Sequence, residues 1–227
     1  MLEEYSRTHI HGLPFDLPEG NRKPWSRQIY FGFKRGFDVA ATVAVAPVAL
    51  GLVGAMALLV KLDGGKAFYA QPRVGRNGKA FKLWKLRTMV PDAEAKLEQY
   101  LKANPAARIE WDLNQKLRQD PRITRVGQFL RKYSLDELPQ LFNVFLGQMS
   151  LVGPRPMCLD QRSQYPGTAY FELRPGLTGL WQVSDRNNCT FTERALHDTR
   201  YARIMSFGTD LQIIFQTVGV VFRGTGL

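Results

Sequence analysis

Two adjacent carboxylates, Asp136 and Glu137, lie in a short segment that also carries several cations. A carboxylate that attacks or coordinates a phosphoryl group meets like-charge repulsion, so it needs cations nearby to neutralise the phosphate oxygens. Arg131 precedes the acid pair, and Arg155 follows it in a Gly-Pro-Arg-Pro turn. Because a guanidinium fork matches two phosphate oxygens at once, this combination of residues predicts phosphate chemistry.

The same acids also fit the start of a helix. Ser134 and Glu137 have the spacing of a capping box, and the helix dipole favours acids in the first turn. Pro139 argues against this interpretation, since it would remove a backbone donor that the helix needs. The two interpretations are compatible, because a helix N-terminus is itself a good phosphate-binding position.

A run of 22 uncharged residues, 39–60, is long enough to span a bilayer, which takes about 20 apolar residues. Pro47 lies near its middle, where a proline removes a helical hydrogen bond and bends the helix. Basic residues flank both ends, which fits a helix that returns to the face it entered from. We therefore expect a re-entrant membrane helix broken at Pro47, with a plain transmembrane helix as the alternative. The flanking cations are Lys34 and Arg35 before the run, and Lys61, Lys66, Arg73 and Arg76 after it.

The remaining pattern predicts an α+β fold that is mostly helical. Residues alternate around Asn77-Gly78, which predicts a short β-hairpin whose second arm places Lys85 and Arg87 on one face. That basic face could equally be solvated, or stack single-stranded nucleic acid. Helical spacing predicts two amphipathic helices over 92–118, broken near Asn104-Pro105, and a helix over 125–132. The apolar segment 211–222 is too short to span and predicts packing at a membrane interface.

The chain length of 227 residues accommodates one compact domain and an appendage. We expect a loose leader over 1–25, the membrane helix over 26–63 and a globular domain over 64–227. The first twenty residues carry no signal-peptide pattern, which predicts a cytoplasmic domain. The net charge of +11 implies an anionic partner, which charge alone does not identify. Two cysteines without a C-x-x-C spacing do not indicate zinc.

The string SLDELPQLFNVFLGQMSLVGPRP resembles the bacterial sugar transferase family. The resemblance includes Lys85-Leu86-Arg87-Thr88-Met89 before the string and Arg174-Pro175-Gly176-Leu177-Thr178-Gly179 after it, and it runs from about Lys34 to the C-terminus. These are monotopic polyprenyl-phosphate phosphoglycosyl transferases. The size and the short leader look most like the small members that initiate exopolysaccharide synthesis.

The resemblance implies a mechanism and a set of site residues. It implies that Asp136 attacks the phosphate attached to the sugar of a UDP-sugar, releasing UMP, and that polyprenyl (undecaprenyl) phosphate then takes up the phosphosugar from the aspartate. It also implies Mg²⁺ at Asp136 and a catalytic role for Glu137, whose nature stays open. The expected phosphate- and substrate-binding residues are Lys85, Arg87, Arg131, Arg155, Arg186 and Asp198.

Three motif positions complete the comparison with the family. Asp198 and Tyr201 match its D-x-x-Y motif, although neighbours at i and i+3 of a helix would look the same. Arg186 follows Ser184-Asp185 where the family usually has Asn-Gly, so this loop departs from the pattern. Asp38 resembles the acid of the K-R-x-x-D entry motif. Two interpretations stay open for it: an ion pair with Lys34 or Arg35, or ordinary solvation of these charges at the membrane interface.

The resulting interpretation is an enzyme at the cytoplasmic face of the bacterial inner membrane, with a UDP-sugar, polyprenyl phosphate and membrane lipids as partners and no nucleic acid. One rival is a membrane-tethered basic binding protein without catalysis. Another is a metal-dependent diphosphate hydrolase. Galactose and glucose are the favoured sugars, and the sugar, the next enzyme and the oligomeric state stay open, with a homo-oligomer compatible with the sequence.

Overall fold

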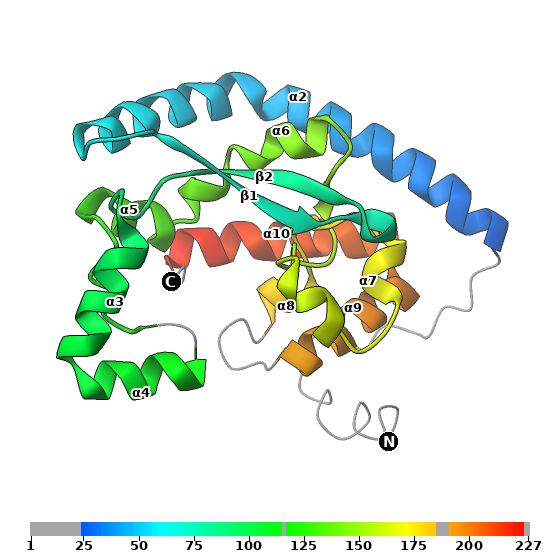
Figure 1. Cartoon of the computed structure of the whole chain (residues 1–227). Coiled ribbons are helices and arrows are strands. Elements are labelled where there is room, and N and C mark those ends of the chain that lie inside the picture. The colour runs from blue at the N-terminus through cyan, green and yellow to red at the C-terminus, as the bar shows by residue number, and fades with distance from the viewer. Residues whose placement is uncertain (1–23, 115–116, 185–190, 225–227) are drawn as a thin grey trace. The chain divides into compact units, whose positions relative to one another are not determined.

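The computed structural model describes residues 24–114, 117–184 and 191–224 (Figure 1). The chain divides into two compact units. Within the described residues, unit 1 comprises 24–47, 70–83 and 140–220, and unit 2 comprises 48–69, 84–139 and 221–224. The predicted leader lies outside the described residues except for Pro24 and Trp25, which already belong to the first helix.

Helix α2 (Pro24–Leu62) contains the whole uncharged run and is long and apolar enough to cross a membrane. Pro47 lies inside this helix, and the division between the two units falls directly after it. The long apolar helix is therefore confirmed, while its re-entrant course stays a prediction. The part of α2 in unit 1 carries Arg27, Lys34 and Arg35. The part in unit 2 carries Lys61 and packs on its core through Val60.

The β-hairpin is confirmed as β1 (Phe68–Val74) and β2 (Ala80–Leu86), which form a two-stranded sheet. The turn between them is a short 3-10 segment, η1 (Arg76–Gly78). Asn77 has φ 57° and Gly78 has φ 73°, the left-handed conformation that an Asn-Gly hairpin turn requires. The Asn-Gly turn was therefore sufficient to predict the hairpin from the sequence.

A second small sheet was not predicted. Strand β3 (Ser150–Val152) pairs in parallel with β4 (Gly176–Thr178), with Ser150 opposite Gly176. A Cβ on Gly176 would lie 2.1 Å from the Gly153 nitrogen, so the two backbones approach more closely than any side chain allows. The pairing joins segments that are far apart in the sequence. Strands of only three residues are too short to show a recognisable alternation of apolar and polar residues.

The other elements are helical, which confirms the mostly helical α+β class. The predicted break at Asn104 and the helix over 125–132 are both observed. These elements are α3 (Ala93–Ala103), α4 (Pro105–Asn114), α5 (Arg125–Lys132), η2 (Leu135–Glu137), α6 (Gln140–Phe145), η3 (Asp160–Gln164), α7 (Ala169–Glu172), α8 (Leu180–Val183), α9 (Phe191–Ile204) and α10 (Phe207–Arg223).

Each unit has its own apolar core. In unit 1 a large cluster joins α2, β3, α9 and α10 and includes Tyr30, Val152, Tyr201 and Ile213. In unit 2 the cluster consists of Val60, Ala67, Leu86 and Leu130, which ties the C-terminal part of α2 to the end of β2 and to α5. The core of unit 2 thus connects the apolar helix with the segments that lead to the acid pair.

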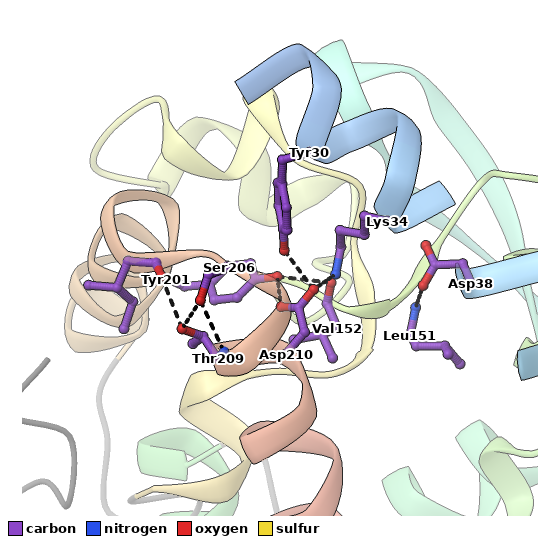
Figure 2. Close-up of polar contacts among 10 residues, drawn as sticks. Tyr30, Lys34, Asp38, Leu151, Val152, Tyr201, Ser206, Thr209 and Asp210 are labelled. Atoms are coloured by element: carbon purple, nitrogen blue, oxygen red, sulfur yellow. Dashed lines mark hydrogen bonds and ion pairs between the residues drawn. The ribbon is translucent and has the colours of Figure 1, made fainter. Parts of the chain in front are cut away.

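A buried polar network fastens the start of α2 to α10 (Figure 2). The Lys34 ammonium lies 2.5 Å from Asp210 Oδ2, and the Tyr30 hydroxyl donates to the same oxygen at 2.6 Å. The Tyr201 hydroxyl donates to Asp210 Oδ1 at 2.6 Å. An ion pair this deeply buried is stable only when hydrogen bonds satisfy the remaining polar atoms, as the two tyrosines do here.

This network corrects the expected role of Asp38. Lys34 pairs with Asp210, and Arg35 donates to the carbonyls of Val144 and Phe145 at 2.6 and 2.7 Å. Asp38 accepts a hydrogen bond from the Leu151 amide at 3.0 Å (Figure 2). The prediction of an ion-pair partner for Asp38 was wrong because the acid that neutralises Lys34 comes from a helix far along the chain.

We predict that Asp210→Asn destabilises the protein, because it leaves the Lys34 charge buried without a counter-ion. The free energy of unfolding should fall by about 3 kcal/mol. Denaturant titration in detergent micelles measures this loss. Lys102→Met is the control, since Lys102 pairs with Glu98 at an exposed site and should give no measurable change. Equal stability of the two variants would contradict the structural role of Asp210.

Candidate active site

The acid pair lies in the short segment η2 of unit 2. Asp136 is buried and Glu137 is partly buried. Ser134, directly before η2, has φ 54° and makes no capping hydrogen bond through its side chain. The capping-box interpretation was therefore wrong, because the left-handed turn at Ser134 separates α5 from η2. The turn directs both acids away from the path of α5.

Lys85 on β2 forms ion pairs with both acids. Its ammonium lies 2.7 Å from Glu137 Oε1 and 3.7 Å from Asp136 Oδ2. The shorter contact makes Glu137 the principal partner of Lys85. One cation thus contacts both acids, Glu137 more closely than Asp136.

Arg131 supplies the second cation. It lies in the last turn of α5, and its Nε donates to Thr88 Oγ1 at 2.9 Å. Helix α5 packs directly on this segment, because a Cβ on Gly127 would lie 2.0 Å from the Thr88 carbonyl oxygen. Thr124 fixes the start of the helix by accepting from the Gly127 amide at 3.0 Å. Strand end and helix are therefore locked together, and they carry Lys85 and Arg131 respectively.

The electrostatics of the site centre on Asp136. Burial raises the pKa of Asp136 above its ordinary value, and Lys85 opposes this most strongly. The negative charge of Glu137 raises the Asp136 pKa further, and Arg131 lowers it. In return, burial lowers the pKa of Arg131, and the charge of Asp136 raises it. Asp136 is thus a desolvated carboxyl group whose anionic form depends on two neighbouring cations.

Arg87, which we predicted to bind phosphate, contacts backbone carbonyls in the structure. It donates to Val60 O, in the last turn of α2, at 3.0 Å and to Gly64 O, two residues beyond the helix. It also donates to Lys66 O at 2.8 Å and to Met89 O at 3.1 Å. A guanidinium at a helix C-terminus satisfies its last carbonyls and complements its dipole. Its role toward substrate stays a prediction.

The other predicted residues belong to unit 1 or lie outside the described residues. The Arg155 guanidinium lies 5.7 Å from the ring centre of Trp181, and that of Arg194 lies 4.7 Å from the same ring. Asp198 is deeply buried and accepts a hydrogen bond from the Tyr165 hydroxyl at 3.0 Å. Arg186 lies outside the described residues. The structure thus joins Asp136, Glu137, Lys85 and Arg131 in one unit and describes Arg155 and Asp198 in the other.

The carboxylates near Asp136 can be compared with what the expected magnesium ion needs as ligands. Within residues 24–114, 117–184 and 191–224 no group of three or more His, Cys, Asp or Glu side chains could hold a metal. Magnesium, however, is commonly bound by one or two carboxylates together with substrate phosphates. Asp136 and Glu137 fit that arrangement, with Asp136 less tightly engaged by Lys85.

Sequence reasoning missed several residues of these arrangements. Thr88 orients Arg131, Tyr165 binds Asp198, and Arg194 shares Trp181 with Arg155. Asp210 carried a usable signal, since it is an acid beside an apolar segment where charge is costly. Tyr165 carried none, because a single hydroxyl in a loop has many ordinary explanations. Thr88 was part of the family motif, but the motif does not reveal its contact with Arg131.

Unit 2 combines the buried Asp136 and the partly buried Glu137 with a lysine and an arginine, and it contains the C-terminal part of the long apolar helix. Acids with cations nearby are the residue types that phosphate chemistry needs. The chain matches the family described as bacterial sugar transferases over residues 29–224. It belongs to this family.

Curated relatives show the range of the similarity. The chain is 45% identical over 195 residues to the UDP-galactose-lipid carrier transferase of Erwinia amylovora, covering 85% of this chain and 41% of that protein. It is 44% identical over 224 residues to the exopolysaccharide production protein ExoY of Rhizobium meliloti (strain 1021), covering 97% and 98%. It is 36% identical over 221 residues to the undecaprenyl-phosphate glucose phosphotransferase of Komagataeibacter xylinus, covering 90% and 38%. The chain thus spans about two fifths of the longer relatives and nearly all of the rhizobial one.

We predict a pH-dependent contribution of Asp198 to stability. Burial raises the Asp198 pKa to about 7, which is above the ordinary value of an unfolded chain. The folded state therefore holds the proton more tightly, so this contribution is full at low pH and is lost as pH rises towards 7 and above. Asp198→Asn, which keeps an oxygen acceptor for Tyr165, should remove this pH dependence and be more stable than the wild type at pH 8.

Tyr165→Phe provides the matched comparison, because the Tyr165 hydrogen bond lowers the Asp198 pKa. Its removal should extend the loss of stability to higher pH. Denaturant midpoints measured across the pH range distinguish the variants. Identical pH profiles for all three proteins would contradict the assignment.

Proposed function

We propose that this chain transfers a sugar-1-phosphate from a UDP-sugar to polyprenyl (undecaprenyl) phosphate and so initiates exopolysaccharide synthesis. Family membership and the names of the relatives support this reaction class. The observation that carries the proposal is the buried Asp136 with Lys85 and Arg131 acting on its charge. Galactose is the first candidate sugar and glucose the second, because relatives named for either are similar to this chain.

In the first step of the proposed mechanism, an Asp136 carboxylate oxygen attacks the phosphorus attached to the sugar. A bond forms between that oxygen and phosphorus, the bond from phosphorus to the bridging oxygen breaks, and UMP leaves with the electron pair. In the second step an oxygen of polyprenyl phosphate attacks the same phosphorus and releases the Asp136 carboxylate. The product is a polyprenyl diphosphate sugar. Two steps suit an enzyme whose donor is soluble and whose acceptor lies in a membrane.

The residues around Asp136 have separate tasks in this proposal. Lys85, held by Glu137, lowers the pKa of Asp136 against the effect of burial and so favours the carboxylate form. Arg131, oriented by Thr88, offsets the charge that accumulates when the carboxylate meets the phosphate. Arg87, Arg155 and Arg186 are proposed to bind phosphates of the substrates. Asp198 is proposed to take part in substrate binding, as the family motif that it matches implies.

Magnesium, held by Asp136 and Glu137 together with the donor diphosphate, would supply charge neutralisation at the phosphate oxygens. The proposed location is the cytoplasmic face of the bacterial inner membrane. Helix α2 supports membrane association through its length and hydropathy. In this proposal it enters the bilayer and returns at Pro47, which brings the acid pair to the level of the lipid phosphate.

We predict that Asp136→Asn abolishes transfer, because an amide is a poor nucleophile toward phosphorus. The rate of UMP release from UDP-galactose in membranes that contain polyprenyl phosphate should fall at least about a thousandfold. Mass spectrometry of the wild type, incubated with donor alone, should detect a phosphosugar adduct that the variant lacks. Retained turnover would remove Asp136 as the nucleophile, and turnover that is independent of polyprenyl phosphate would favour hydrolysis.

We predict that Lys85→Met shifts the pH profile of UMP release. Because Lys85 lowers the pKa of Asp136, its removal should raise that pKa and move the acid limb of the profile to higher pH. The loss of rate should therefore be larger at pH 6 than at pH 8. Lys82→Met, an exposed position on the same strand, is the control and should keep the wild-type profile. A loss of rate that is uniform across pH would contradict this role for Lys85.

A further inference from the structure

The ring of Trp181, in α8, has two guanidinium groups over it. The Arg194 guanidinium lies 4.7 Å from the ring centre, and that of Arg155 lies 5.7 Å from it. Both distances fall within the range of about 6 Å over which an aromatic ring attracts a cation. Arg194 belongs to α9 and Arg155 to the segment after β3. One ring therefore attracts two cations that would otherwise repel each other.

The backbone on either side of Arg155 is held in place. Before it, the Gly153 amide donates to Thr178 O at 2.9 Å. After it, Met157 O accepts from the Val74 amide at 3.1 Å. Arg155 also lies between two prolines, whose rings restrict the backbone further. The freedom that remains at this position is that of the long side chain.

The start of α8 lies against the same segment. A Cβ on Gly179 would lie 2.1 Å from Gly153 O, so the two backbones are in direct contact. Gly179 immediately precedes α8, and Trp181 is the second residue of that helix. Arg155 and Trp181 thus each follow one of the two glycines by two residues. The close approach of the glycines brings the guanidinium and the ring together.

The polar atom of the Trp181 ring does not explain its position. Its Nε1 is buried and has no hydrogen-bond partner among the residues that the structure describes. A buried indole N–H usually has an acceptor. The ring face, in contrast, contacts two guanidinium groups. The face of the ring is therefore the part of this side chain that has a task.

Arg194 has a second electrostatic partner in unit 1. It precedes Asp198 by four residues on α9, which makes the two residues neighbours on the helix surface. The charge of Arg194 lowers the pKa of Asp198, against burial, which raises it. The contact of Arg194 with Trp181 therefore connects α8 with the helix of the buried acid. The contact of Arg155 with the same ring is the one that bears on a substrate phosphate.

We propose that Trp181 is a positioning residue whose ring holds the Arg155 side chain in the orientation that binds a substrate phosphate. An arginine side chain has many rotamers, and a ring that restricts them in advance reduces the entropy lost on binding. Contact with the ring does not require hydrogen-bond donors, so those of Arg155 stay available for phosphate oxygens. This inference rests on the role of Arg155 in the proposed function.

The test measures UMP release by the full-length protein in membranes. UDP-galactose and polyprenyl phosphate are varied in turn, so that each has its own KM. Arg155→Gln identifies the substrate whose KM depends on Arg155. Trp181→Leu should raise the same KM by roughly tenfold, the size of a cation–π contact, and Trp181→Phe should recover part of this loss because it keeps a ring face.

The matched control is Trp111→Leu. It removes a ring of the same kind in unit 2, where the Arg122 guanidinium lies 5.0 Å from the ring centre. Both KM values should stay at the wild-type level. Melting temperatures in detergent verify that each variant is folded, and Trp181→Phe takes the place of Trp181→Leu in the cycle below if the leucine variant does not fold.

A double-mutant cycle separates positioning from a general structural effect. Two residues that act through one another have non-additive effects. We therefore expect Trp181→Leu to change this KM little in the Arg155→Gln background. An equal increase in both backgrounds overturns the proposal, as does an increase confined to the KM of the other substrate. Non-additivity with Arg194→Gln instead of Arg155→Gln would make the ring a structural contact of α9 and also overturn it.

The same measurements distinguish failure of this inference from failure of the proposed function. Normal UMP release by the wild type, with KM values that Arg155→Gln leaves unchanged, overturns the inference and leaves the proposed reaction intact. A wild type that releases no UMP from any UDP-sugar in the presence of polyprenyl phosphate overturns the proposed reaction, and the inference with it.

Discussion

A carboxylate removed from water stays anionic only where nearby cations replace its lost hydration, and the organisation of unit 2 follows from this constraint. Asp136 is buried, and the charges of Lys85 and Arg131 oppose the effect of that burial on its pKa. Neither cation is held by Asp136 alone. Glu137 binds Lys85, and Thr88 binds Arg131. Both cations are therefore positioned by residues other than Asp136. Such an arrangement leaves the acid available for a ligand.

The basic residues at the start of α2 have a different role in the structure from the one that the sequence analysis gave them. Lys34 and Arg35 resemble the positive charges that collect beside membrane segments, and the sequence analysis used them in that sense. In the structure Lys34 is neutralised by Asp210, and Arg35 holds the carbonyls of α6. Both side chains fasten α2 to its own unit. Counting Lys34 and Arg35 as charges that would face lipid headgroups therefore overestimates the positive charge available at the start of α2 for inferring membrane topology.

The sequence predicted what depends on neighbouring residues. Asn77-Gly78 gave the hairpin, Pro105 gave the break between α3 and α4, and the uncharged run gave the long helix. It also grouped Asp136, Glu137, Lys85 and Arg131 through the family resemblance. It failed for Asp38, Ser134 and the β3–β4 pairing, where the deciding partner lies far along the chain or where a single backbone angle changes the local path. Long-range partners leave no local periodicity to detect.

The clamp of Arg87 on the end of α2 has a mechanical consequence. Arg87 holds the carbonyls of Val60 and Gly64, and it follows Lys85 by two residues on the same extended segment. A displacement of that helix end would therefore move Arg87 and, two residues before it, Lys85, whose ammonium binds Glu137. Bilayer thickness alters the tilt of apolar helices through hydrophobic mismatch. In the proposed membrane location, lipid composition would therefore influence the geometry of the acid pair as well as the position of the helix.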